Sequence, residues 1–212
     1  MAEINEKITQ LVIAGDGALL ETMVHMALDT GGNAATILDQ ALLPAMDIVG
    51  QRMKTGEMFI PEVLLAAKTM EAGLKVLTPF LAEGEKSNAG TCVLGTVEGD
   101  LHDIGKNLVG MMLSGSGFKV IDLGINVTAA DFGKAAVENN AGIVCMSALL
   151  TTTMPKMKQT IDHLTEAGLR ETVKILVGGA PVTAEYAREI GADGYGFNAA
   201  DAVEKAKEFA AG

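Results

Sequence analysis

The chain has 212 residues, which is enough for one large domain or two modest ones, and 49% of them are hydrophobic and can supply a core. The formal net charge of -11, with no visible basic cluster, disfavours nucleic acid as a partner. No apolar run is long enough to span a membrane and the first residues do not resemble a secretion signal, so we expect a cytoplasmic protein without a membrane partner.

Residues 1–82 are expected to form a four-helix bundle. Apolar residues recur at helical spacing in segments that start near residues 4, 17, 34 and 60. Asp16 is placed to cap the second helix, Pro44 should bend or interrupt the third, and Pro61 suits the first turn of the fourth. Residues 83–90 are polar and contain glycine without periodicity, and we place a linker there.

Residues 91–212 are expected to form an α/β domain. Short β-branched runs alternate with helical segments, and the predicted strands are residues 92–97, 119–127, 142–147, 174–178 and 194–197. The intervening helices start near residues 104, 129, 154 and 183, and a last one starts near 201. This alternation predicts a five-stranded parallel sheet of the flavodoxin or Rossmann-like kind, with strand order 2-1-3-4-5.

Unusual residues follow three of these strands, and the predicted order brings their loops to one crevice. Asp100 and His102 follow the first strand, a hydroxyl-rich run from Ser147 follows the third, and two glycines follow the fourth. Such loops suit a cofactor that brings flat or phosphate-bearing groups against the backbone. His102 is then a base, a metal ligand or an ordinary helix-start residue, and the residues alone leave these three roles open. A zinc site made by the protein alone would need further ligand residues at metal-ligand spacing from His102, and the sequence does not offer them.

The two cysteines are expected to be buried, reduced thiols. Cys92 and Cys145 both lie in β-branched apolar runs without a neighbouring cysteine or histidine at metal-ligand spacing.

The pattern Asp100-x-His102-x-x-Gly105, then Ser147-x-Leu149, then Gly178-Gly179 resembles the DxHxxG, SxL, GG signature of cobalamin-binding domains. The helical part, most clearly residues 56–61, resembles the cap domain of that family. The two-part layout is similar to the free-standing corrinoid proteins of methyltransferase systems and to the cap plus cobalamin-binding module of methionine synthase. The resemblance therefore implies that the chain binds cobalamin or another corrinoid.

The resemblance also implies roles for individual residues. His102 would be the lower axial ligand to cobalt in place of the cofactor's own base, a base-off/His-on arrangement, with Asp100 behind it and Thr153 where methionine synthase has a serine. The displaced nucleotide tail would enter a slot lined by Ser147, Leu149, Thr151, Gly178 and Gly179, with Asn198 and Ala199 near its end. The remaining cofactor contacts would come from Gly99, Leu101, Asp103, Ile104 and Gly105, and from Met53, Phe59 and Ile60 of the cap. An alternative is that the three cap residues fill the bundle core.

By the same resemblance, the chain would be a methyl carrier. It would accept a methyl group on cob(I)alamin from a donor-specific methyltransferase and pass it, as methylcob(III)alamin, to a second methyltransferase that acts on tetrahydrofolate or a thiol coenzyme. A reductive activase is a further candidate partner. A cobalamin-dependent sensor is the alternative, although this chain has no spare DNA-binding segment. The cobalamin domain of a radical mutase would not have the helical cap, and a flavodoxin-like or receiver domain would not explain the signature.

Overall fold

The computed structural model describes residues 2–80 and 89–211. The chain divides into two compact units, residues 1–88 with 114–117 and residues 89–113 with 118–212. Most of the predicted linker, residues 83–90, lies outside the described residues. Within the described ranges, no helix has the length and apolar character needed to cross a membrane.

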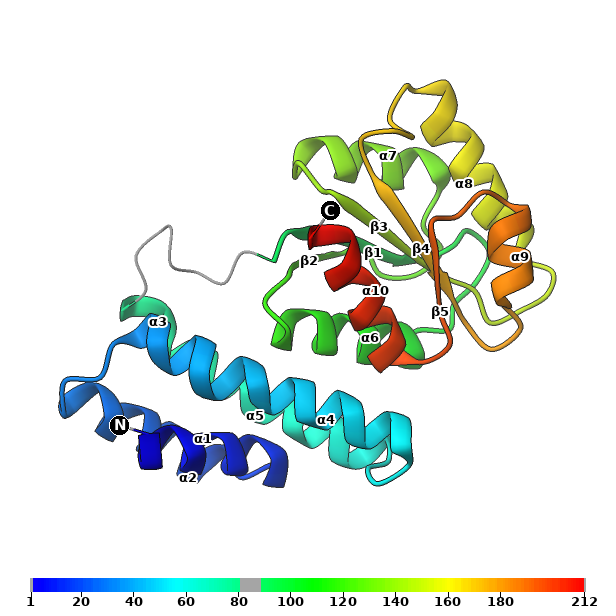
Figure 1. The fold of residues 1–212 in the computed structure, drawn as a ribbon. Helices are drawn as coiled ribbons and strands as arrows, with labels where there is room; N and C mark the ends of the chain where they lie inside the picture. The colour runs from blue at the N-terminus through cyan, green and yellow to red at the C-terminus, as the bar shows by residue number, and fades with distance from the viewer. Residues whose placement is uncertain (1, 81–88, 212) are drawn as a thin grey trace. The chain divides into compact units, whose positions relative to one another are not determined.

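The first unit is helical, as predicted. Its elements are α1 (Ala2–Ala14), α2 (Gly17–Asp29), α3 (Ala34–Ile37), α4 (Leu43–Thr55) and α5 (Ile60–Leu77), followed by a short 3-10 turn (Thr78–Phe80) (Figure 1). Asp16 accepts the Leu19 backbone N–H at 3.1 Å and so caps α2, because this N–H has no partner inside the helix. The apolar stripes of the helices form the buried core of this unit, which includes Ile8, Leu20, Ile37, Leu42, Met46, Met70 and Leu77.

The third predicted helix is interrupted. A π-helical turn, Leu38–Leu42, separates α3 from α4. Pro44 lies in the first turn of α4, where its missing N–H costs no helical hydrogen bond. The interruption therefore precedes the proline and leaves α4 regular up to Gly56, which takes a left-handed conformation and ends the helix.

The second unit contains a parallel sheet of five strands, β1 (Thr91–Thr96), β2 (Lys119–Asp122), β3 (Ile143–Ser147), β4 (Lys174–Gly178) and β5 (Gly194–Gly196). Its order is β2-β1-β3-β4-β5, so the predicted fold class and strand order are confirmed. The helices are α6 (Ile104–Gly115), α7 (Ala129–Glu138), α8 (Pro155–Glu166), α9 (Ala184–Glu189) and α10 (Ala199–Ala211). Figure 1 shows α7 and α8 on one face of the sheet, with α6 and α10 on the other.

The second predicted strand is too long. β2 ends at Asp122 and not at Val127, and the segment 123–127 keeps a single isolated bridge, between Val97 and Val127. Gly124 and Asn126 both have positive φ, which turns the chain away from the extended conformation of a strand. The other predicted strand bounds and helix starts agree with the observed ones to within two residues.

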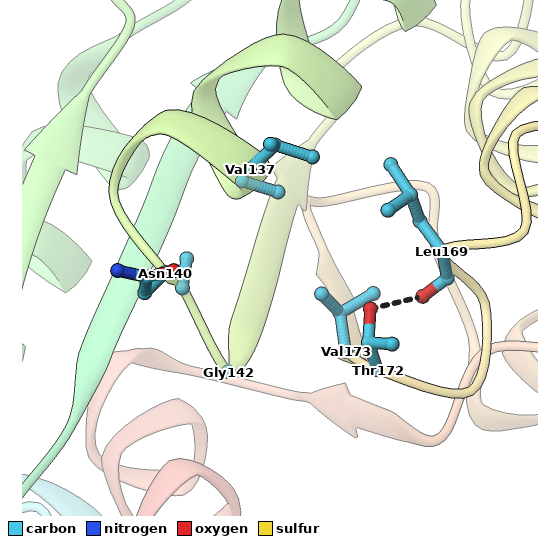
Figure 2. Close-up of a pocket in the computed structure, with 8 residues that line it drawn as sticks. Val137, Asn140, Gly142, Leu169, Thr172 and Val173 are labelled. Atoms are coloured by element: carbon cyan, nitrogen blue, oxygen red, sulfur yellow. Dashed lines mark hydrogen bonds between the residues drawn. The ribbon is translucent and has the colours of Figure 1, made fainter.

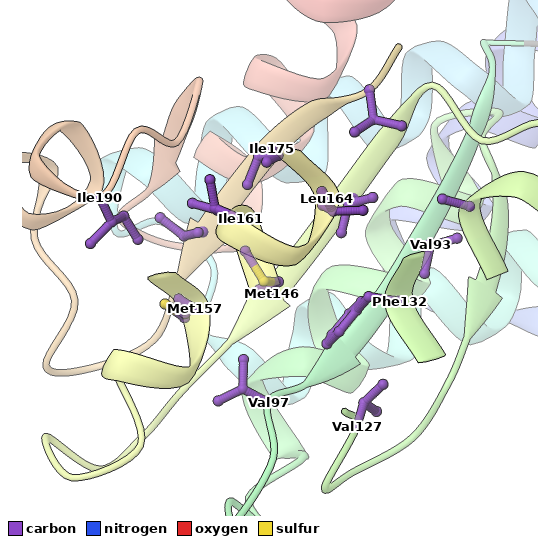
Figure 3. Packing of buried hydrophobic residues seen from close by; sticks show 14 of the residues in the cluster. Val93, Val97, Val127, Phe132, Met146, Met157, Ile161, Leu164, Ile175 and Ile190 are labelled. Atoms are coloured by element: carbon purple, nitrogen blue, oxygen red, sulfur yellow. The ribbon is translucent and has the colours of Figure 1, made fainter. Parts of the chain in front are cut away.

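The core of this unit lies between the sheet and the helices α7 and α8. Phe132 is fully buried there, in one cluster with strand residues that include Val93, Met146 and Ile175 (Figure 3). Both cysteines are buried and free, as predicted. A large apolar core of this kind stabilises the sheet and leaves its loops to carry the unusual residues.

Candidate functional site

The carboxyl ends of the strands meet at one edge of the sheet. The strand register places Thr96 beside Ser147, Ser147 beside Gly178, and Gly178 beside Gly196. The loops after β1, β3 and β4 therefore leave the sheet side by side. These loops carry Asp100 with His102, the hydroxyl-rich run, and the second glycine, so the structure brings the predicted segments to one edge.

Asp100 joins two of these loops. Its side chain is fully buried, and its Oδ1 accepts the His102 backbone N–H at 3.1 Å and lies 2.7 Å from His102 Nδ1. Its Oδ2 accepts the Thr153 hydroxyl at 2.7 Å and the backbone N–H groups of Leu149 and Leu150 at 2.8 and 3.3 Å. A buried carboxylate with this many donors fixes the loop after β1 to the loop after β3.

These contacts determine that Asp100 is ionised and that His102 carries a proton on Nδ1. Burial by itself would raise the pKa of Asp100, but the hydrogen bonds from Thr153, Leu149 and His102 outweigh it and hold that pKa well below its usual range. An ionised carboxylate only accepts hydrogen bonds, so the nearby Nδ1 of His102 carries a proton and donates it. In the neutral imidazole, Nε2 then keeps its lone pair. Because the His102 side chain is 50% exposed, this nitrogen can serve as a ligand.

Thr96, at the end of β1, fixes the backbone of His102. Its hydroxyl donates to the His102 carbonyl oxygen at 2.8 Å, and the residue is completely buried at the end of β1. Together with the two contacts to Asp100, this bond fixes both backbone polar groups and one ring nitrogen of His102. Sequence reasoning missed Thr96, since a threonine at the end of a β-branched run looks like an ordinary strand residue.

Three of the four predicted glycines, Gly105, Gly178 and Gly179, meet different surroundings. Gly179 has φ +126°, and a Cβ there would lie 1.9 Å from the Ala148 carbonyl oxygen. A Cβ on Gly178 would lie 3.0 Å from the Gly196 carbonyl oxygen. A Cβ on Gly105 would have no neighbour within 4 Å. Close approach of backbones thus explains Gly178 and Gly179, while Gly105 faces open space.

Large apolar side chains are exposed along the carboxyl edge to an unusual degree. Ile104 and Phe197 are 78% and 77% exposed, and the full set at the carboxyl edge is Leu101, Ile104, Ile125, Leu149, Leu150 and Phe197. In the rest of the described α/β unit, Val137 alone joins them. A concentration of exposed apolar residues around a polar ligand marks a binding surface.

The other predicted residues at this edge have various surroundings. Asp103 accepts the Asn107 side-chain amide at 3.1 Å, and Thr151 is exposed. Asn198 accepts the Asp201 N–H at 2.9 Å near the start of α10, and Ala199 is buried. Because β3 and β4 separate β1 from β5, these last two lie further along the edge from His102.

The predicted cap residues follow α4 or lie in it. Phe59 is 68% exposed, Ile60 is also exposed, and Met53 is partly buried. Met58 instead is buried next to them. Phe59 and Ile60 therefore do not fill the bundle core, which excludes that interpretation for both.

Sequence reasoning missed two further sets of contacts, one made by the last residue of β2 and one by the loop that follows it. Lys106, buried in the first turn of α6, places its Nζ 2.7 and 2.5 Å from the two carboxylate oxygens of Asp122. Asn126 accepts the Gly99 N–H at 2.7 Å and donates its own N–H to the Asp100 carbonyl at 3.0 Å. The sequence signal that could have indicated this loop is Gly-Ile-Asn at residues 124–126, which lies within the predicted strand 119–127.

The opposite edge of the sheet contains a cavity of about 370 Å³ (Figure 2). Its lining comes from the turns that lead into β3 and β4, and includes Val137, Asn140, Gly142, Leu169 and Val173. No residue that we predicted for the site lines it. The cavity therefore has no part in the site around His102.

Comparison with known proteins supports a corrinoid site. A family model described as a B12 binding domain matches residues 90–204, and a second model with the same description matches residues 4–78. The chain is 43% identical to a corrinoid protein of Desulfitobacterium hafniense, over 96% of this chain and 95% of that protein. The chain belongs to the cobalamin-binding corrinoid proteins of methyltransferase systems.

Two other relatives of this corrinoid protein are informative. A trimethylamine corrinoid protein of Methanosarcina barkeri is 42% identical over 97% of this chain and 95% of its own length. A chain in the crystal structure of the methanol:cobalamin methyltransferase complex MtaBC from the same organism superimposes with a TM-score of 0.89 at 30% identity, covering 99% of this chain and 80% of that one.

The residues at the carboxyl edge fit a corrinoid. The ring is large and mostly apolar, and the exposed side chains around His102 offer it a matching surface. Nε2 offers a neutral nitrogen of the kind that cobalt binds, and a Cβ on Gly105, three residues on, would meet no protein atom within 4 Å. The ring nitrogen of His102, the exposed apolar surface and the space at Gly105 are thus what a protein of the cobalamin-binding family needs at this edge.

Proposed function

We propose that this corrinoid protein carries methyl groups between two methyltransferases and that His102 is the lower axial ligand to cobalt, with the cofactor's own base displaced. The observation that carries the proposal is the 2.7 Å contact between His102 Nδ1 and the buried, ionised Asp100. Cobalamin, when bound, supplies a cobalt centre that accepts and releases the methyl group. The protein supplies the ligand, its orientation and the surface.

The Asp100 carboxylate has two tasks in this proposal. It fixes the His102 tautomer with Nε2 unprotonated, and it raises the basicity of that nitrogen. Thr153 positions the carboxylate, since its single hydroxyl proton faces both Asp100 Oδ2 at 2.7 Å and the Leu150 carbonyl at 2.9 Å. The ionised oxygen is the stronger acceptor and takes the proton. Nε2 would hold the metal when the cofactor is bound, and Asp100 would hold the Nδ1 proton of the ring throughout.

The surrounding residues would bind the rest of the cofactor. We assign the exposed Leu101 and Ile104 to the ring, and Ser147, Thr151, Gly178 and Gly179 to the slot for the nucleotide tail. Gly99, Asp103, Gly105 and Leu149 complete the surroundings of His102, and Asn198 with Ala199 the far end of the slot. In the helical unit, the exposure of Phe59 and Ile60 supports the assignment of these two residues, together with Met53, to the methyl-bearing face of the cofactor.

The relatives favour a methylated amine as the methyl donor, because a trimethylamine corrinoid protein shares 42% of its residues with this chain over nearly the whole length. The partners in this proposal are a donor-specific methyltransferase, an acceptor methyltransferase and a reductive activase. A reconstituted assay with exchanged donor enzymes tests the donor, and tetrahydrofolate against a thiol coenzyme tests the acceptor. Transfer from methanol but not from any methylamine would overturn the assigned donor.

Electron paramagnetic resonance of the protein loaded with cobalamin in the cob(II) state tests the ligand. The axial nitrogen of ordinary protein should split the signal into triplets, and nitrogen-15 histidine should convert these to doublets. The His102→Ala variant should lose the histidine splitting, while His163→Ala, a change on α8, should keep it. A splitting that ignores the label would show that the cofactor's own base stays bound and would overturn the proposal.

A further inference from the structure

The loop after β2 reaches the site through Asn126. The Asn126 Oδ1 accepts the Gly99 N–H at 2.7 Å, and the Asn126 N–H donates to the Asp100 carbonyl at 3.0 Å. These two bonds hold the peptide groups on either side of the Gly99–Asp100 peptide, one before Gly99 and one after Asp100. Asp100 is fully buried, so its carbonyl needs a partner of this kind.

Asparagine suits this position because the backbone there is left-handed. Asn126 has φ +54°, a conformation that strains most residues other than glycine but that asparagine tolerates. Glycine would adopt the same backbone but has no side-chain acceptor for the Gly99 N–H. A β-branched residue would lose the acceptor and also strain the turn.

The loop that carries Asn126 is itself anchored on both sides. The Gly124 carbonyl accepts the Thr96 N–H at 3.0 Å, and the Val127 N–H donates to the Thr96 carbonyl at 2.9 Å. The Gly124 N–H donates to Asp122 Oδ1 at 2.8 Å, and Asp122 is paired with the buried Lys106. Asn126 therefore contacts the Asp100 peptide from a fixed base, and a change in its side chain will be felt at Asp100.

We propose that Asn126 is a positioning residue for the axial ligand: it fixes the backbone on both sides of Asp100, through the Gly99 N–H and the Asp100 carbonyl, and thereby aims the Asp100 carboxylate at His102 Nδ1. This inference rests on the proposed function, since it assumes that His102 binds cobalt. Asn126 itself touches neither the metal nor its ligand. Its role is to keep His102 in the orientation in which Nε2 can bind.

A second left-handed asparagine provides a matched control. Asn140 has φ +49° in the turn between α7 and β3, at the opposite edge of the sheet. Its backbone N–H donates to the Val137 carbonyl at 3.2 Å, within its own turn. Substitutions at Asn140 therefore impose the same backbone strain without disturbing the Asp100 peptide.

The experiment compares Asn126→Gly, Asn126→Val and Asn126→Asp with Asn140→Gly and Asn140→Val, each loaded with cobalamin as cob(II). The fraction of the paramagnetic resonance signal with histidine splitting and the affinity for cobalamin are measured. Asn126→Gly should weaken cobalamin binding roughly 3- to 10-fold, the equivalent of one hydrogen bond. Asn126→Val should weaken it roughly 10- to 100-fold and lower the histidine-ligated fraction, because backbone strain is added.

Asn126→Asp should behave like the parent, because aspartate also tolerates the left-handed turn and accepts the Gly99 N–H. In the apoprotein, hydrogen exchange of the Gly99 amide should become faster in Asn126→Gly and stay unchanged in Asn140→Gly. This measurement does not depend on the metal or on the cofactor.

The outcomes separate this inference from the proposed function. If the unmodified protein shows no histidine splitting, the axial ligand is wrong. If it shows the splitting but Asn126→Val keeps the full histidine-ligated fraction, or if Asn140→Val loses as much of it, Asn126 has no positioning role. Urea unfolding shows whether Asn126→Val still folds. If it does not, Asn126→Gly takes its place in this comparison, because glycine adopts the left-handed backbone without strain.

Discussion

The two edges of the sheet are built differently although the same strands lead to both. At the carboxyl edge, hydrogen bonds from the side chains of Asp100, Thr153 and Asn126 join three loops, and apolar residues of these loops are exposed. At the amino edge, short backbone turns lead into β3 and β4, and the Arg170–Asp193 pair, at 2.9 Å, lies beside them. The difference teaches that buried polar contacts are concentrated where the loops must hold a defined geometry.

The largest expected effect is that of adding a side chain at Gly179, at the carboxyl edge. In Gly179→Ala the new Cβ would lie 1.9 Å from the Ala148 carbonyl oxygen, and the residue would keep φ +126° under strain. The backbone must shift, and we expect a loss of roughly 3 kcal/mol or more in the free energy of unfolding. Urea unfolding of the apoprotein measures this. A loss below about 0.5 kcal/mol, the range of an ordinary surface change, would show that the packing against Ala148 is not as described.

The next effect concerns a carboxylate at each edge. Asp100→Asn should weaken cobalamin binding by roughly 10- to 100-fold, as expected for loss of the group that supports a metal ligand. Asp193→Asn is the control, since Asp193 accepts the Ile175 N–H at 2.8 Å and pairs with Arg170 at the amino edge. Both variants should lose stability, but Asp193→Asn should bind cobalamin normally. If the two variants bound cobalamin with equal affinity, Asp100 would have no role in the binding site.

The pH dependence of stability gives a further test of Asp100. Its pKa is lower in the folded protein than in the unfolded chain, where it is about 3.9. The ionised form therefore stabilises the fold fully above about pH 4, and this contribution is lost as the pH falls through the folded-state value. In the apoprotein with His102→Ala as the common background, which removes the ring that Asp100 contacts, the difference in unfolding free energy with and without Asp100→Asn should be constant from pH 6 to 8 and shrink below about pH 4. A difference that grows on acidification would contradict the described hydrogen bonds.

The sequence predicted the architecture of both units well because it depends on periodic apolar residues. The alternation of strands and helices was enough to give the order of the sheet, and Asp100 and His102 were found through a short pattern. The β2 boundary was wrong because a β-branched run continues through Ile125 to Val127, whereas the positive φ of Gly124 and Asn126 turns the chain. Thr96 and Asn126 were missed since their roles depend on hydrogen bonds between loops far apart in sequence, and no local pattern records such bonds.

A buried hydroxyl offers a smaller effect that is again specific to one edge. In Thr96→Val the His102 carbonyl loses a hydrogen bond of 2.8 Å, and we expect a loss of about 1 kcal/mol in stability together with a lower histidine-ligated fraction of cob(II). Thr160→Val is the matched change on α8, where an equally buried hydroxyl donates to the Lys156 carbonyl at 2.9 Å. It should cost a similar free energy and leave histidine ligation intact. Identical spectra for the two variants would show that Thr96 only stabilises the strand.

The smallest effect, and one of opposite sign, is expected at the amino edge. Gly142 lies in the turn before β3 with a backbone that other residues can adopt, and a Cβ there would have no neighbour within 4 Å. Gly142→Ala should therefore stabilise the apoprotein by about 0.4 to 1 kcal/mol, because the unfolded chain loses conformational freedom. Cobalamin affinity should not change, since the cavity that Gly142 lines lies at the other edge of the sheet from His102. Weaker cobalamin binding in this variant would mean that the two edges are coupled through the strands, and the contrast between them would then no longer hold.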